Sequence, residues 1–177
     1  MKDDNRGITL VEIIIIIALI GVLSGVFIGG MGYIPNSAAR SLATSIKSAI
    51  GETRIKTMGK QETVLHIYKD ASDGKYYKQM LYIENGAAKA DQVEMIGKHH
   101  PIVTYTYEGT SGDVTSTLDS DGVYIGFNRT NGKEEVIPVP GVSGVNSVIC
   151  KEIVVTGGGA NCTITIVPAT GKVSYDG

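Results

Sequence analysis

Residues 6–27 read RGITLVEIIIIIALIGVLSGVF, and this stretch decides how the chain is organised. Across residues 8–31 the strongly polar side chains are Thr9, Glu12 and Ser24. As an α-helix, these 24 residues would extend about 36 Å, which is enough to cross the hydrocarbon core of a bilayer. The sequence therefore predicts a membrane-spanning helix near the N-terminus.

The segment before this apolar run, residues 1–7, is short and polar and ends in Arg6-Gly7. A secretory signal peptide has a shorter apolar centre of about 7 to 15 residues, with its cleavage site after that centre. Here the sharpest change in composition comes before the helix. A cut after Gly7 would keep the helix on the mature chain and create a new α-amino group at Ile8.

Glu12 is out of place in an apolar helix, because an ionised carboxylate in hydrocarbon costs several kcal/mol unless it is paired or protonated. Cleavage after Gly7 would put the positive amino group of Ile8 four residues from Glu12, at a similar membrane depth. The two charges would then neutralise one another. The alternative is that Glu12 lies at the membrane interface and stays hydrated, which explains the helix but not the Gly7-Ile8 junction.

The run from Arg6 to Glu12 and the apolar residues behind it resemble the class III leader of type IV prepilins and pseudopilins. The resemblance implies that a membrane prepilin peptidase cuts between Gly7 and Ile8 and N-methylates Ile8. It also implies that Glu12 pairs with the N-terminus of a neighbouring subunit during assembly. Ile8 stands where the family usually has Phe, and Gly29 where many members have a helix-kinking Pro; the glycines around Gly29 would instead weaken the helix.

The length of 177 residues leaves room for one globular domain and an appendage. We expect a leader at 1–7, a transmembrane and filament-core helix at 8–34, an amphipathic helix at 35–60 that continues into the globular domain, and a β-rich globular domain at 61–177. The predicted fold class is α+β. A long hydrophobic N-terminal helix would pack by its C-terminal half on an antiparallel β-sheet or β-sandwich.

The second helix shows apolar residues at helical spacing up to about Gly59. Pro35 disfavours the α conformation at the residue before it, so the pattern predicts an interruption there, with Asn36 or Ser37 as the new cap. The basic residues are expected on a solvated face of this helix. They are Arg40, Lys47, Arg54 and Lys56.

Strand-like runs at 63–69 and 76–83 flank Ser72-Asp73-Gly74 and predict a β-hairpin, because Asp-Gly favours a tight turn. Further strand-like runs lie at 102–108, 123–128, 135–139, 147–156 and 162–168. Short strands at this spacing suggest antiparallel β-structure. Residues 84–98 and 109–121 show no clear pattern.

The final segment reads IVVT-GGGAN-CTITIVP-ATGKVSY, and this strand, glycine turn and strand ending in Thr-Gly-Lys resemble minor pseudopilins of the GspH/FimT type. Gly157-Gly158-Gly159 lacks the Lys-Ser/Thr of a phosphate-binding loop and is not followed by a helical pattern. It is therefore predicted to be a hairpin turn.

Cys150 and Cys162 would lie outside the cytoplasm in a pilin-like orientation, where a disulfide is chemically permitted. If the glycine turn is symmetric, Val155 faces Cys162, and Cys150 lies five residues further along the strand, roughly 17 Å away. A shifted register or a bulge would bring the two sulfurs together. A disulfide and a pair of buried free thiols both stay open as hypotheses.

Other polar residues give no strong site, and we expect no metal, cofactor or catalytic activity. The histidines, His66, His99 and His100, have no identifiable partner ligands and are expected in exposed loops. Asp119 and Asp121 with the glycine after them suggest an oxygen-rich calcium loop, but the EF-hand spacing and its bidentate glutamate are missing. A turn is the preferred interpretation.

These patterns predict a non-enzymatic filament subunit, either a minor pilin or a pseudopilin. The resemblance implies a single-pass cytoplasmic membrane protein whose C-terminal domain is extracytoplasmic, and a surface pilus or pseudopilus after assembly. The implied partners are prepilin peptidase, other subunits, the inner-membrane assembly machinery and the membrane. Two alternatives stay open. One is a competence-type subunit that captures DNA, which the net charge of -2 disfavours, and the other is an ordinary membrane-anchored protein.

Overall fold

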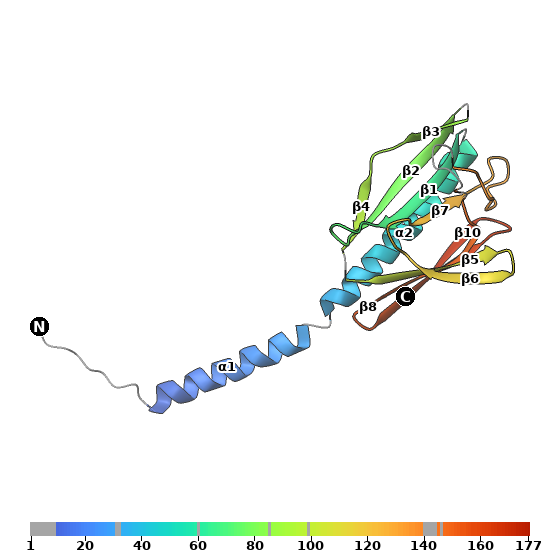
Figure 1. Cartoon of the computed structure of the whole chain (residues 1–177). Coiled ribbons are helices and arrows are strands. Elements are labelled where there is room, and N and C mark those ends of the chain that lie inside the picture. Colours follow the sequence, from blue (N-terminus) through green and yellow to red (C-terminus); the bar gives the residue numbers. More distant parts are fainter. Residues whose placement is uncertain are drawn as a thin grey trace, which may run out of the picture.

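The computed structural model describes residues 10–30, 33–59, 61–84, 86–98, 100–139, 145 and 147–177, with the side chains of residues 23–35 left undescribed. Two helices precede the strands in this part of the chain: α1 (Leu10–Gly30) and α2 (Tyr33–Gly59). Figure 1 shows α1 extending away from the β-rich domain, whereas α2 lies within that domain. The strands are β1 (Glu62–Lys69), β2 (Tyr76–Glu84), β3 (Ala87–Ala90), β4 (Glu94–Gly97), β5 (Ile102–Gly109), β6 (Gly112–Thr117), β7 (Val123–Gly126), β8 (Cys150–Gly157), β9 (Ala160–Val167) and β10 (Lys172–Asp176).

The boundary between the helices differs from the sequence-based prediction. α1 ends at Gly30, inside the glycine cluster, and α2 begins at Tyr33. Pro35 is therefore the third residue of α2, and Asn36 and Ser37 lie inside the helix instead of capping it. A helix tolerates proline in its first turn because the N–H groups there have no intrahelical acceptor.

The strands form two antiparallel sheets, which confirms the α+β class. Sheet A has the order β3-β2-β1-β7, with β4 also paired to β2, and sheet B has the order β10-β9-β8-β5-β6. A single parallel bridge between Ile125 and Val148 joins the end of sheet A to the segment before β8. Two sheets that meet in this way leave a space between their inner faces, and α2 occupies it.

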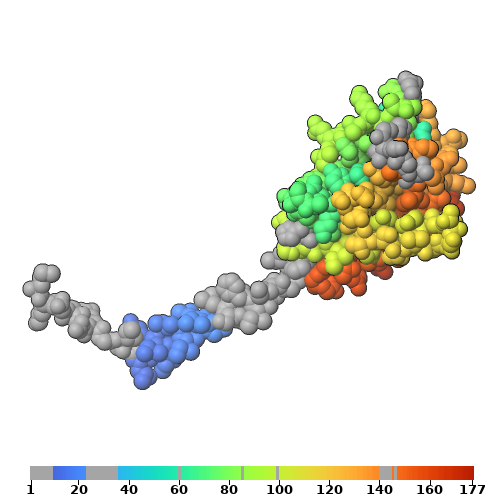
Figure 2. Space-filling view, in the orientation of Figure 1, coloured from blue at the N-terminus to red at the C-terminus, as the bar shows by residue number. Residues whose placement is uncertain are grey.

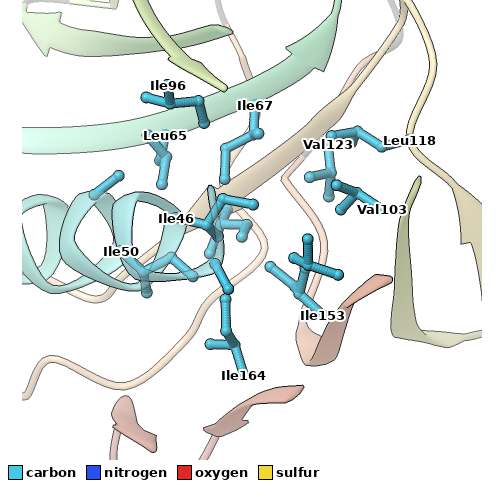
Figure 3. Packing of buried hydrophobic residues seen from close by; sticks show 14 of the residues in the cluster. Ile46, Ile50, Leu65, Ile67, Ile96, Val103, Leu118, Val123, Ile153 and Ile164 are labelled. Carbon is cyan, nitrogen blue, oxygen red and sulfur yellow. The ribbon is translucent and has the colours of Figure 1, made fainter. Parts of the chain in front are cut away.

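The main core forms where one face of α2 meets both sheets. The buried residues on this face recur every three to four positions, as an amphipathic helix requires. Figure 3 shows Ile46 of α2 between Ile67 of sheet A and Ile164 of sheet B. The fully buried hydrophobic residues of this helical face are Ala39, Leu42, Ala43, Ile46, Ala49 and Ile50.

Two predicted hairpins are confirmed with their turns. β1 and β2 pair in register from Glu62 opposite Ile83 to Lys69 opposite Tyr76, and Gly74 in the turn has a φ of 67°. β8 and β9 are joined by Gly158 and Gly159, whose φ values of 62° and 90° match the primed turns of tight hairpins.

The predicted strand at 135–139 is not a strand of either sheet. Its backbone pairs only at separate points, where the Glu135 N–H donates to the Gly126 carbonyl and the Val139 N–H to the Val145 carbonyl, both at 3.0 Å. The N–H of Ile137 bonds instead to the Ser147 hydroxyl at 2.7 Å, and Pro138 has no N–H to offer. The unpatterned segments at 84–98 and 109–121 hold β3, β4 and β6. These strands are short and mostly exposed, so they lack the apolar alternation that identifies a half-buried strand.

Truncation of Ile46 to alanine tests the importance of this shared core. The side chain is fully buried between α2 and the sheets, so Ile46→Ala is expected to lower the free energy of unfolding by about 2–5 kcal/mol. Ile55→Ala is the matched control on the same helix, because Ile55 is 72% exposed. Chemical denaturation of the full chain in detergent micelles measures both changes, and equal losses would contradict this description of the core.

Candidate functional site

The N-terminal helix presents large aliphatic side chains on all of its faces. Between residues 10 and 22 their exposure ranges from 47% at Ile13 to 75% at Leu10. Because successive helical residues are rotated by about 100°, the unbroken run of isoleucines from 13 to 17 leaves no polar face. Figure 2 shows this part of α1 as a rod that projects away from the domain. A helix that is apolar all round belongs in a hydrophobic environment.

The predicted processing and assembly residues are only partly described. Gly7 and Ile8 lie outside the described residues, so the proposed cleavage junction has no geometry here. Glu12 lies in the first turn of α1 and is exposed, a position where a carboxylate also interacts favourably with the helix dipole. Among the residues whose side chains are described, no helix is both long and apolar enough to cross a membrane.

Two of the basic residues of α2, Arg54 and Lys56, are bonded to the β domain. This corrects the prediction that they lie on a solvated face. Arg54 donates from Nε to the carbonyl oxygen of Gly132 at 3.0 Å and from Nη2 to that of Thr170 at 2.9 Å. Lys56 donates to the Tyr82 hydroxyl at 3.0 Å and pairs with Glu52 at 3.0 Å, and these contacts raise the pKa of the Lys56 amine. Side-chain bonds therefore fix the C-terminal part of α2 to both sheets.

His66 lies in β1 and not in a loop, contrary to the prediction, and it belongs to a row of rings on the outer face of sheet A. Its ring stacks on Tyr124 at a centroid distance of 4.0 Å and on Tyr68 at 4.7 Å, and Tyr68 stacks on Tyr77 at 5.8 Å. Burial lowers the pKa of His66. Because the rings stack on one another, their inner faces are not free to stack on a base or a sugar.

His99 lies outside the described residues, and His100 is exposed. Within the described ranges no group of three His, Cys, Asp or Glu side chains is placed to hold a metal ion. The Asp119 carboxylate accepts hydrogen bonds from the backbone N–H groups of Asp121 and Gly122, both at 3.1 Å, which confirms a turn at this position.

The two cysteines are free, fully buried thiols. The register places Val155 opposite Cys162, as the symmetric turn predicts, whereas Cys150 pairs with Tyr107 at the start of β8. A bulge in β8 lies near Cys150 but does not bring the two sulfurs together. Of the two hypotheses, the structure has the free thiols and not the disulfide.

Sequence reasoning missed one buried carboxyl group, that of Glu134. Its side chain is 7% exposed, and its Oε1 accepts a hydrogen bond from the Cys150 backbone N–H at 2.9 Å. Burial raises the pKa of Glu134 to about 8. The neighbouring Glu135 is exposed, and nothing in the local sequence distinguishes one glutamate from the other.

Comparison with known proteins gives one match, at the N-terminus. Residues 2–28 match the family model of the prokaryotic N-terminal methylation motif. This match includes Gly7, Ile8 and Glu12 and most of α1, but it ends well before the final hairpin. The comparisons with curated proteins and with solved structures give no significant match.

Proposed function

On the premise that the chain carries the class III prepilin leader of type IV pilin-like proteins, we propose that it is a structural subunit, a minor pilin or a pseudopilin, of a type IV pilus or a type II secretion-like filament. Its role is assembly and not catalysis. The observation that carries the proposal is α1, whose aliphatic side chains between residues 10 and 22 are exposed on every face and lie within the stretch that matches the methylation motif.

The leader motif implies an ordered sequence of events at the membrane. Prepilin peptidase cuts after Gly7, and the new N-terminus at Ile8 is methylated. The retained helix then holds the subunit in the bilayer, with the β domain on the extracytoplasmic side. In the filament, the helices of neighbouring subunits replace the lipid around α1.

The exchange of lipid for other helices explains why Glu12 matters. Both environments are apolar, so the hydrophobic effect keeps α1 out of water but does little to favour the filament over the bilayer. A carboxylate that pairs with the amino group of a neighbouring subunit would supply a preference for the filament. The same pairing would set the axial position of one subunit against the next, because two buried charges tolerate little misplacement.

The bonds between α2 and the sheets support a rigid β domain on the filament surface. Arg54 joins α2 to the turns at Gly132 and Thr170, which follow β7 of sheet A and β9 of sheet B. Lys56 joins it to Tyr82 on β2. A subunit held in this way would transmit the position of its filament helix to its surface domain.

The DNA-capture alternative gains no support from the β domain. Lys151, one of the few lysines near the final hairpin, pairs with Asp113 across sheet B. The ring row on sheet A, which would otherwise suggest base stacking, is occupied by its own stacking contacts. We therefore propose no nucleic-acid function.

Mass analysis of the mature N-terminus tests the proposal. In the host, the chain is expected to begin at Ile8, to lack residues 1–7 and to carry one added methyl group. A bulky substitution, Gly7→Val, is expected to leave the leader attached because it obstructs the cleavage site. A wild-type chain that retains residues 1–7 would refute the filament proposal and favour an ordinary membrane-anchored protein.

Substitution of Glu12 separates membrane insertion from assembly. Glu12→Leu is expected to insert in the membrane at least as well as wild type, since it removes a polar group, but to be lost from sheared filaments by about tenfold or more. Thr9→Leu is the matched control, because it changes a polar residue three positions before Glu12 without removing a charge. Immunoblots of membrane and filament fractions measure both; normal incorporation of the Glu12 variant would disprove the pairing role.

A further inference from the structure

Glu134 lies in the segment between the two sheets, residues 127–139, which turns back on itself at residues 129–131 and which we call the connecting segment. This segment leaves β7 of sheet A at Phe127, which forms an isolated bridge with Glu134. The segment reaches sheet B at Glu134. The backbone N–H of Glu134 donates to the Pro168 carbonyl at 3.1 Å, and the Oε1 of Glu134 accepts from the Cys150 N–H at 2.9 Å. Main chain and side chain of one residue thus hold the segment against sheet B.

The site favours the protonated form of the carboxyl group. The side chain is 7% exposed, and its Oε2 is buried with no hydrogen-bond partner among the described residues. An ionised carboxylate in this place would keep one bond and lose most of its hydration, which is costly. The bond from Cys150 favours the ionised form, but burial outweighs it, so the pKa of Glu134 rises to about 8.

The groups around Glu134 do not offset this cost. From β8 it is faced by the Cys150 thiol, and Glu152 lies behind that thiol; both would repel a carboxylate or stay neutral. Phe127 and Pro168, which meet it from β7 and from the turn after β9, carry no charge. None of the described lysines or arginines interacts with the carboxyl group.

From this geometry we propose that Glu134 is a pH-sensitive latch, which holds the connecting segment against sheet B while its carboxyl is protonated and releases it when the proton is lost to solvent. Oε2 has no hydrogen-bond partner in either form, and burying it as a charged oxygen costs more than burying it neutral, so the ionised side chain is favoured to reach water by lifting the segment from Cys150. The folded state binds this proton more tightly than the unfolded chain. Stability from the latch is therefore present at acidic pH and falls as the pH rises from about 4.5 to about 8.

The release is confined to the middle of the connecting segment. On the N-terminal side of Glu134, the Arg54 guanidinium bonds to the Gly132 carbonyl, and this contact does not titrate in the same range. On the C-terminal side, the Ile137 N–H is held by the Ser147 hydroxyl at 2.7 Å. The affected part lies between these two points and includes the Cys150 amide on β8.

Amide hydrogen exchange of the full chain in detergent micelles, measured by NMR, tests the latch. The protection factors of the Glu134 and Cys150 amides are expected to fall about tenfold between pH 6.5 and pH 9 in wild type. In Glu134→Gln, which keeps an acceptor for Cys150 but cannot ionise, they are expected to stay constant. Glu135→Gln is the matched control on the exposed neighbour and is expected to behave as wild type.

An equal fall in protection in Glu134→Gln, or no fall in wild type, would overturn the proposal. The carbon-13 shift of the Glu134 carboxyl in wild type gives a second measurement that needs no variant. A titration midpoint near pH 8 supports the latch, and a midpoint below pH 6 refutes it even if Glu134→Gln does not fold.

Discussion

The main physical constraint on this protein is that α1 has no polar face and that its described side chains are exposed. Large aliphatic side chains between residues 10 and 22 remain about half to three quarters exposed. Burying one such side chain fully contributes about 1.5–3 kcal/mol, so the chain gains by placing α1 in lipid or among other apolar helices. The β domain does not cover it. In the function proposed above, a membrane location and polymerisation would both follow from this lack of cover.

The next helix, α2, is covered by the β domain, in contrast to α1. Its buried face supplies the core that both sheets share, and its polar face is bonded at Arg54 and Lys56 to turns and strands far along the chain. The domain is thereby built around the helix that follows α1 in the chain. The latch at Glu134 acts at a different junction, where the sheets meet at their ends, and it leaves the contacts of α2 intact.

The parts predicted correctly from the sequence are those whose signal is local. The likeness of the N-terminal segment to a prepilin leader, which the methylation-motif match at residues 2–28 supports, needs no tertiary context, whereas cleavage after Gly7 and pairing of Glu12 stay predictions. The turns at Gly74 and Gly158 follow from glycine's access to positive φ. The errors concern features that depend on distant partners: Arg54 bonds to a carbonyl 78 residues away, and Glu134 is buried only because β8 lies beside it. His66 was placed in a loop although the run at 63–69 already predicted a strand there; only the row of stacked rings, which comes from three strands, gives no contiguous pattern.

The most direct test of the central claim is the accessibility of α1 in assembled filaments. Two cysteine variants are compared: Ile17→Cys in α1, where Ile17 is 64% exposed in the single subunit, and Ser120→Cys at an exposed position of the β domain. The native thiols contribute little labelling because both are fully buried. In sheared filaments, a charged maleimide is expected to label the Ser120→Cys chain and to leave the Ile17→Cys chain unlabelled. Equal labelling of the two variants would contradict the claim that subunits assemble by covering α1.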